Sequence, residues 1–312
     1  MDAIGVDIGG TKIAAGVVDD SGRVRAKRRC STDPADPAAI ERAVAELVAD
    51  LRQDFAVSAV GVAAAGFVSS DRATVLFAPN IAWRDYPLRG RLASLIDVPV
   101  VIENDANAAG WAEFRFGAGR RVDSMIMLTV GTGLGGAIVI GSELLRGAHG
   151  VAAEVGHIRM VPNGHMCGCG HPGCWEQYAS GTALTRQARA AAVADPERAS
   201  VLLDLAGGAP ARIGGQHVTQ AAGQSDPLAV ELIAELGSWL GAGIADLVSV
   251  LDPSLVVIGG GVASAGDLLL DPARDAFRRA LSARDHRPEP LICAAELRND
   301  AGLVGAADLA RR

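Results

Sequence analysis

Three cysteines gather in one ten-residue stretch of this 312-residue chain, where residues 167–176 read CGCGHPGCWE. Three thiolates and one imidazole are the ligand set of a closed, tetrahedral structural zinc site, and four such ligands occur within eighteen residues here. The intervening glycines permit the sharp turns that this spacing needs. A disulfide pair or reactive thiols are the alternatives, but no signal peptide that would direct the chain to an oxidising compartment is evident. The stretch therefore predicts a zinc site that fixes the positions of the nearby acidic side chains of Glu154 and Glu176.

Composition narrows the class of protein. The length fits about two domains, and only 4% of residues are aromatic, so the cores are built mainly from aliphatic side chains. A net charge of −7 argues against a nucleic-acid partner, which needs clustered basic side chains. Residues 124–142 are uncharged and long enough to span a membrane, but their central glycines favour two strands around a turn. We expect a soluble, cytoplasmic protein with no membrane contact.

The order of elements indicates an internal duplication. The chain opens as strand, glycine turn and strand, continues with a helix over about 36–54, and reaches buried strands over 57–62 and 98–102. A second strand, glycine turn and strand begins at about residue 124. Two copies of a hairpin-first α/β unit predict two similar domains that face each other across a cleft.

Two glycine-rich turns are candidate phosphate sites. Residues 7–12 (DIGGTK) place an acid at a strand end, before glycines that let backbone N–H groups approach an anion. An acid beside a phosphate needs a cation between them, so Asp7 indicates Mg²⁺; an ordinary hairpin turn is the alternative. Residues 131–136 (GTGLGG) match the dinucleotide fingerprint in spacing, but a strand is expected after them where the fingerprint requires a helix. We interpret them as a second phosphate turn.

Two further segments carry candidate chemistry. Residues 259–261 are three glycines between a strand and a helical segment, either a close approach for a nucleotide or a tight turn. Residues 103–107 (ENDAN) lie where a buried strand meets a helix, the edge at which α/β proteins bind ligands. One residue there is suited to act as a base, although Asn104 or Asp105 as a simple helix cap is an equal alternative. Residues 205–216 are rich in Gly and Ala and are expected to form a surface loop without a chemical role.

Taken together, these segments resemble the ROK family of sugar kinases, most closely its bacterial glucokinases. The matching pieces include DIGGTK, ENDAN, GTGLGG, the EVGH of residues 154–157, the cysteine-rich stretch and the glycines from 259, in family order over nearly the whole chain. The resemblance implies an α/β, actin-like, hexokinase-type ATPase fold with two similar domains. The small domain would span 1–107, closed by a C-terminal helix at 300–312, and the large domain 108–299 would carry the zinc site.

The resemblance also implies the residues of the site. Asp105 would be the catalytic base that accepts the proton of the sugar 6-hydroxyl, and zinc would orient the sugar pocket without activating water. The zinc ligands would be His157, Cys167, Cys169 and Cys174. The sugar would be bound by Asn80, Asn104, Asp105, Glu154, His157 and Glu176. Mg-ATP would be held by Asp7, Gly9, Gly10, Thr11, Lys12, Thr132, Gly133, Gly260 and Gly261.

The expected reaction is ATP-dependent phosphorylation of glucose to glucose 6-phosphate. Another hexose, such as N-acetylglucosamine, N-acetylmannosamine or mannose, is an alternative substrate, because space around the 2-position is not visible in a sequence. A sugar-sensing protein without turnover is a second alternative, disfavoured by the intact Asp105 and both phosphate turns. The family resemblance favours a homodimer or homotetramer.

Overall fold

The first of two five-stranded sheets has the strand order β3-β2-β1-β4-β8 in the computed structural model, which describes residues 1–312. β1 pairs antiparallel with β2 and parallel with β4, and β8 continues the parallel half. The carboxyl ends of β1, β4 and β8 therefore meet at one edge. The strands are β1 (Asp2–Ile8), β2 (Lys12–Val18), β3 (Val24–Ser31), β4 (Val57–Ala64) and β8 (Val100–Asn104).

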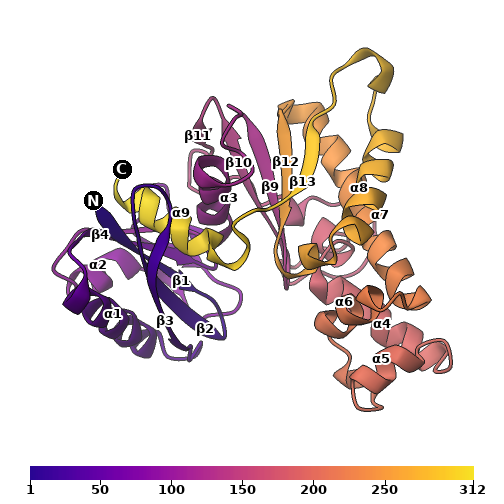
Figure 1. The fold of residues 1–312 in the computed structure, drawn as a ribbon, viewed down its shortest axis with the longest axis horizontal. Coiled ribbons are helices and arrows are strands. Elements are labelled where there is room, and N and C mark those ends of the chain that lie inside the picture. The colour runs from indigo at the N-terminus through magenta and orange to yellow at the C-terminus, as the bar shows by residue number, and fades with distance from the viewer. The chain divides into compact units, whose positions relative to one another are not determined.

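Side chains of β1 alternate between two helical layers. Ile4, Val6 and Ile8 belong to a buried core with the apolar stripe of α1 (Pro37–Asp54) and with α2 (Leu88–Ala93). The opposite face, which includes Gly5 and Asp7, packs against α9 (Ala301–Ala310). Figure 1 shows α1 and α9 on the two sides of this sheet. The predicted helix over 36–54 is confirmed, with Asp36 as the N-cap that accepts a hydrogen bond from the Ala39 N–H at 3.0 Å.

Glycines let α9 lie directly on the sheet. A Cβ at Gly5 would lie 1.8 Å from the carbonyl oxygen of Leu303, and one at Gly61 would lie 1.8 Å from that of Ala306. These clashes are with backbone, which cannot rotate away as a side chain can. The glycines of β1 and β4 therefore allow the backbone of α9 to pack directly against the backbone of the sheet.

Gly61→Ala is consequently expected to destabilise the protein by about 3 kcal/mol or more, because α9 has to move off the sheet. Gly90→Ala is the matched control, since Gly90 lies in α2 and no atom lies within 4 Å of its added Cβ. The control should be neutral or stabilising by up to about 1 kcal/mol. Urea unfolding of both variants measures the difference. Similar midpoints would contradict the close packing of α9.

The second five-stranded sheet has the order β11-β10-β9-β12-β13, which repeats the connectivity of the first. The hairpin strands come first in the sequence, and the later strands join on the other side, as the duplication predicted. Residues 124–142 form two strands and a turn, so that prediction is confirmed. The strands are β9 (Met125–Val130), β10 (Leu134–Ile140), β11 (Glu143–Leu144), β12 (Leu255–Gly259) and β13 (Leu291–Ala294).

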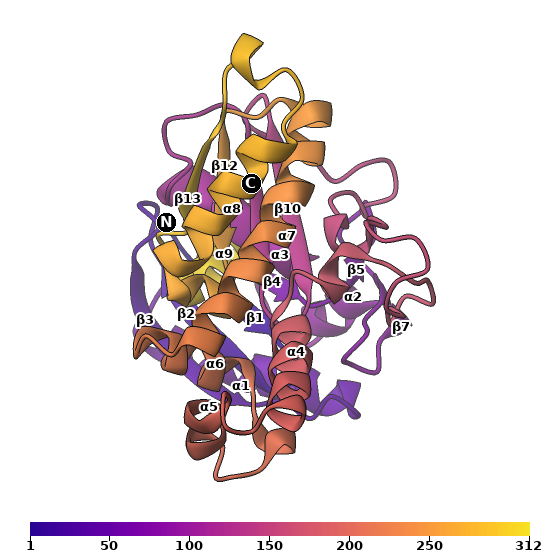
Figure 2. The same cartoon turned by 90° about the vertical axis from the view of Figure 1, so that its right-hand side faces the viewer.

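The helices of the second half pack around a long central one. Figure 2 shows α7 (Pro227–Leu251) beside α8 (Asp267–Ala280), and Gly237 and Gly241 of α7 face the α8 backbone closely. Length and composition alone would let α7 cross a membrane, yet 61% of its most apolar window is buried within the protein. Because a core helix passes the same test, α7 is weak evidence for a membrane span. The remaining helices are α3 (Asp105–Phe116), α4 (Gly181–Ala194), α5 (Ser200–Leu205) and α6 (Gly215–Gly223).

The chain divides into two compact units. Unit 1 comprises Met1–Ile126, Ala137–Ala153 and Glu296–Arg312, and unit 2 comprises Met127–Gly136 and Glu154–Ala295. Unit 1 also contains a small three-stranded sheet that the sequence did not predict, of β5 (Phe67–Val68), β6 (Val75–Phe77) and β7 (Arg84–Tyr86).

Candidate active site and metal centre

Asp105 is the first residue of α3, immediately after β8 in unit 1. Asn104 caps this helix: its Oδ1 accepts from the Asn107 N–H at 2.9 Å, and its Nδ2 donates to the Gly66 carbonyl at 3.0 Å. The Asp105 Oδ1 accepts from the Ala106 N–H at 2.9 Å. Asn104 therefore does cap the helix, as one alternative held, and this leaves Asp105 available for chemistry.

Asp7 and the first glycine turn lie at the same sheet edge of unit 1. Asp7 is paired in register with Ala63 of β4, and Ala63 with Glu103 of β8. The turn is closed by a 3.0 Å hydrogen bond from the Gly9 N–H to the Lys12 carbonyl. A Cβ at Gly10 would lie 3.4 Å from the Cβ of Asn80, so this exposed asparagine stands beside the turn.

Two carboxylates at this edge, Asp7 and Asp105, have raised pKa values. Burial raises the pKa of Asp105 to about 6, and the negative charge of Asp7 contributes to the increase. Burial also raises the pKa of Asp7, against the opposing charges of Lys12 and Lys27. Two carboxylates with raised pKa values at one sheet edge suit a hard divalent cation, whose charge would favour their ionised forms.

Asp105→Asn is expected to stabilise the protein above pH 6, by at most about 3 kcal/mol. The native fold holds the Asp105 proton more tightly than the unfolded chain does, so the native protein loses stability as pH rises from about 4 to about 6. The variant has no such titration, and its advantage should be small near pH 4 and complete above pH 6. Urea unfolding without metal at pH 4 and pH 8 measures it. An equal difference at both pH values would contradict the raised pKa.

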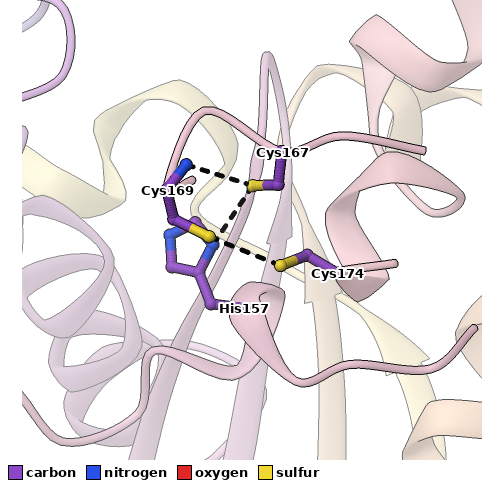
Figure 3. A group of neighbouring side chains, drawn as sticks. All are labelled: His157, Cys167, Cys169 and Cys174. Carbon is purple, nitrogen blue, oxygen red and sulfur yellow. Dashed lines mark hydrogen bonds between the residues drawn. The ribbon is translucent and has the colours of Figure 1, made fainter. Parts of the chain in front are cut away.

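The predicted zinc ligands form one cluster in unit 2. The ligand atoms of His157, Cys167, Cys169 and Cys174 all lie within 4.8 Å of one another. The Cys169 and Cys174 sulfurs are 3.5 Å apart, and the Cys167 sulfur lies 3.6 Å from His157 Nδ1 (Figure 3). A tetrahedral ion with Zn–S bonds of ~2.3 Å holds its sulfur ligands about 3.8 Å apart. The donor set and its spacing therefore fit zinc.

Backbone geometry brings these ligands together. The Cys167 N–H donates to the His171 carbonyl at 3.0 Å, and the Cys169 N–H donates to the Cys167 sulfur at 3.5 Å. Gly173 has a φ of +81°, and a Cβ there would lie 1.8 Å from the Val161 carbonyl oxygen. Only glycine fits this position, so the Gly before the third cysteine is required by the turn.

An acidic side chain, that of Glu176, contacts two of the four candidate metal ligands. Glu176 Oε1 accepts from the Cys167 thiol at 2.9 Å and lies 3.9 Å from His157 Nδ1. Glu176 Oε2 lies 2.7 Å from where a Cβ of Gly133 would be, so the second glycine turn is adjacent. Because Nδ1 of His157 faces the sulfurs, its Nε2 is left for another partner. Glu154 directly precedes the short helical turn that carries His157.

A cavity of about 510 Å³ opens in unit 2 beside the second turn. It includes the predicted Thr132 and Gly261, whereas Gly133 and Gly260 are not among its lining residues. Gly260 instead has a φ of +88° and packs on the backbone of Val130. The full lining is Gly131, Thr132, Gly181, Thr182, Thr185, Gly215, Gln216, Thr219, Gly261, Val262 and Ser264.

Much of this cavity is lined by residues that no sequence pattern above indicated. Residues 205–216 were expected to be a loop without a chemical role, but Gly215 and Gln216 line the cavity at the start of α6. The expected loop is wrong at its end, because Gly214 is the N-cap of α6 and the helix begins at Gly215. Gly181 and Thr182 begin α4 after the N-cap Ser180, and Thr182 Oγ1 donates to the Thr132 carbonyl at 2.7 Å. A Ser-Gly-Thr run at a helix start was the available signal.

The fold and these sites define a sugar kinase of the hexokinase type. The model of the ROK family matches residues 3–312, so the chain belongs to the ROK family. A glucokinase of Streptomyces coelicolor is 54% identical over 308 residues, covering 99% of this chain and 97% of that protein. The crystal structure of a ROK family glucokinase from Streptomyces griseus in complex with glucose and AMPPNP has a TM-score of 0.93 and 55% identity, covering 100% and 99% of the two chains. An N-acetylmannosamine kinase of Yersinia pseudotuberculosis is 33% identical over 312 residues, covering 99% and 98%.

Proposed function

We propose that this protein transfers the γ-phosphoryl group of ATP to the 6-hydroxyl of glucose. The observation that carries the proposal is the full-length similarity, at 55% identity, to a glucokinase solved with glucose and AMPPNP. The raised pKa of Asp105, at the edge of the sheet where Asp7 also lies, supports the same chemistry.

Asp105 is assigned the role of general base. It would accept the proton of the 6-hydroxyl while that oxygen attacks the γ-phosphorus, and ADP would leave. A pKa of about 6 keeps the carboxylate ionised at neutral pH yet basic enough to take a proton. Its position at the first turn of α3, next to the capping Asn104, holds it in one place.

Polar side chains in each unit are assigned to the binding of sugar hydroxyls. In unit 1, the Asn104 Oδ1 that caps α3 accepts one hydrogen bond and can accept another from a sugar hydroxyl. Asn80 lies beside the first glycine turn. In unit 2, His157 would donate or accept through Nε2, and Glu154 and Glu176 would accept hydroxyl protons. A zinc ion bound by His157 and the three cysteines would hold the ring of His157 in a fixed orientation.

The nucleotide is assigned to the cavity and the second glycine turn of unit 2, and the turn of residues 7–12 in unit 1 is assigned to phosphate and magnesium. The cavity lining is mostly apolar with a few polar groups from Thr185, Gln216 and Ser264, and its volume of about 510 Å³ is ample for an adenosine group. The turn at Thr132 adjoins the cavity, where it would meet the phosphates. Magnesium, when bound near Asp7, would neutralise charge on the phosphates.

An ADP-release assay with a panel of sugars tests the proposed function. Glucose, mannose, fructose, N-acetylglucosamine and N-acetylmannosamine should be supplied to zinc-replete protein with ATP and Mg²⁺. We expect glucose to have the highest kcat/KM. Preference for N-acetylmannosamine, the substrate named for the relative at 33% identity, would overturn the choice of sugar. No turnover with any sugar would favour a sugar-sensing protein. A homo-oligomeric state and a cytoplasmic location stay predictions.

Gly261→Leu is expected to raise the KM for ATP by at least about tenfold and to leave the KM for glucose within about twofold. Gly261 lines the cavity and no atom lies within 4 Å of its added Cβ, so a larger side chain would occupy nucleotide space without a clash in the fold. Gly223→Leu is the matched control, because Gly223 is equally open but does not line the cavity. Steady-state kinetics measure both constants. An unchanged KM for ATP in Gly261→Leu would place the nucleotide elsewhere.

A further inference from the structure

Glu103 is a buried carboxylate that none of the roles assigned above uses. It is 2% exposed and lies one residue before Asn104, at the end of β8. Its Oε1 accepts from the Asn104 N–H and from the Asn107 side-chain amide, both at 3.2 Å. One oxygen of Glu103 therefore holds the junction between β8 and α3 at two points, on either side of Asp105.

The other oxygen of Glu103 meets two arginines. Arg146 Nε donates to Oε2 at 2.7 Å, and Arg72 Nε lies 3.7 Å from the same atom. Arg146 belongs to the segment after β11, and its carbonyl accepts from the Ala152 N–H at 3.0 Å. Arg72 lies in the turn after β5, and its Nη2 donates to the Leu309 carbonyl of α9 at 3.3 Å. Glu103 thus connects two other segments of unit 1 to the junction that carries Asp105, and Arg72 extends this connection to α9.

Stability alone does not account for this arrangement. Two arginines and one carboxylate leave an excess positive charge in a largely buried place, and Arg72 Nε is buried without a hydrogen bond. Arg72 also has a φ of +57°, a conformation that costs a non-glycine residue free energy. Apolar residues of similar volume often replace such ion clusters without loss of stability. Because the cluster of Glu103, Arg72 and Arg146 costs free energy, we look for its role in the position of the β8–α3 junction.

We propose that Glu103, paired with Arg146, is a positioning residue for the transfer reaction that holds Asn104 and Asp105 in their working geometry. Both oxygens of Glu103 are engaged by protein groups, so it would act through the backbone of Asn104 and the side chain of Asn107. The inference about catalysis rests on the proposed function. The inference about geometry does not, because the contacts to Asn104 and Asn107 exist whatever the reaction is.

Kinetics of Glu103→Gln and Arg146→Gln test the catalytic part. Each change removes the ion pair, and a small displacement of a base can cost up to about 100-fold in rate. We expect kcat to fall about 10- to 100-fold, with the KM for ATP within about threefold. The double variant should be no worse than the poorer single one, because both act through one contact. A kcat within threefold of the native value in both single variants would overturn the proposal. Should Glu103→Gln fail to fold, Arg146→Gln decides this arm, since its side chain is 27% exposed.

Glu41→Gln is the matched control. Glu41 is also a buried glutamate of unit 1, lies 3.8 Å from an arginine, Arg91, and accepts a hydrogen bond from the Tyr86 hydroxyl. It lies on α1, away from the β8–α3 junction. This variant should keep its kcat even if it loses stability. An equal loss of kcat in Glu41→Gln would mean that any buried ion pair of unit 1 has the same effect, and would overturn the positioning role.

Hydrogen exchange separates this inference from the proposed function. The amides of Asn104 and Asn107 should exchange at least about tenfold faster in Glu103→Gln, while those of α1 stay unchanged. Unchanged exchange at the junction would overturn the proposal even if activity fell. If the native protein phosphorylates no sugar, the proposed function fails, and faster exchange would still establish that Glu103 positions the junction.

Discussion

Asp105→Asn should lower kcat for glucose phosphorylation by about 10²- to 10⁴-fold and leave glucose affinity nearly unchanged. The amide has the shape of the carboxylate and can still accept the Ala106 N–H, but it cannot take the hydroxyl proton. Binding of glucose is measured by calorimetry and turnover by ADP release. A variant that keeps a tenth of the native kcat would remove Asp105 from the role of base.

Two controls test whether the loss of kcat in Asp105→Asn comes from the loss of the general base. The kcat/KM of the native enzyme should fall as pH drops through about 6, since protonated Asp105 is inactive, and the residual activity of the variant should not show this limb. Asp97→Asn changes a surface aspartate that pairs with Arg52 and should behave as the native enzyme does. A native acid limb well below pH 5 would contradict a raised pKa for the base.

Cys169→Ser should lower zinc affinity by more than about 100-fold and raise the KM for glucose at least about tenfold. Serine is a poor zinc ligand, and the sulfurs of Cys167 and Cys174 would be left without a common partner. Glu176 and His157 contact Cys167 directly, so loss of the ion should disorder the side chains proposed to bind sugar. Metal analysis and steady-state kinetics on the same preparation measure both effects.

Cys30→Ser is the control for thiol chemistry in general. Cys30 lies on β3, outside the cluster, and the variant should keep its zinc and its KM. Loss of zinc from Cys169→Ser with an unchanged KM for glucose would show that the metal does not orient the sugar site. A full zinc content in that variant would show that Cys169 is not a ligand.

Local patterns predicted most of the elements correctly. The α1 helix follows from its apolar spacing and its cap at Asp36, and the strand after the second glycine turn excluded a dinucleotide fold. The small sheet of β5, β6 and β7 escaped prediction because its strands have only two or three residues each. Such short strands carry no period that a pattern could reveal.

The sequence by itself determined the cluster of His157 and three cysteines and the two glycine turns, because the residues of each lie close together along the chain. The sequence also placed Asp105 at a strand-to-helix junction. It did not determine whether Asn104 or Asp105 caps the helix there. Only the tertiary structure decided that Asn104 is the cap, that Gln216 lines the cavity, and that Arg146, 43 residues away, pairs with Glu103. The physical reason is that these contacts join distant segments through packing of side chains and backbone, and no short spacing in the sequence records which segments the fold brings together.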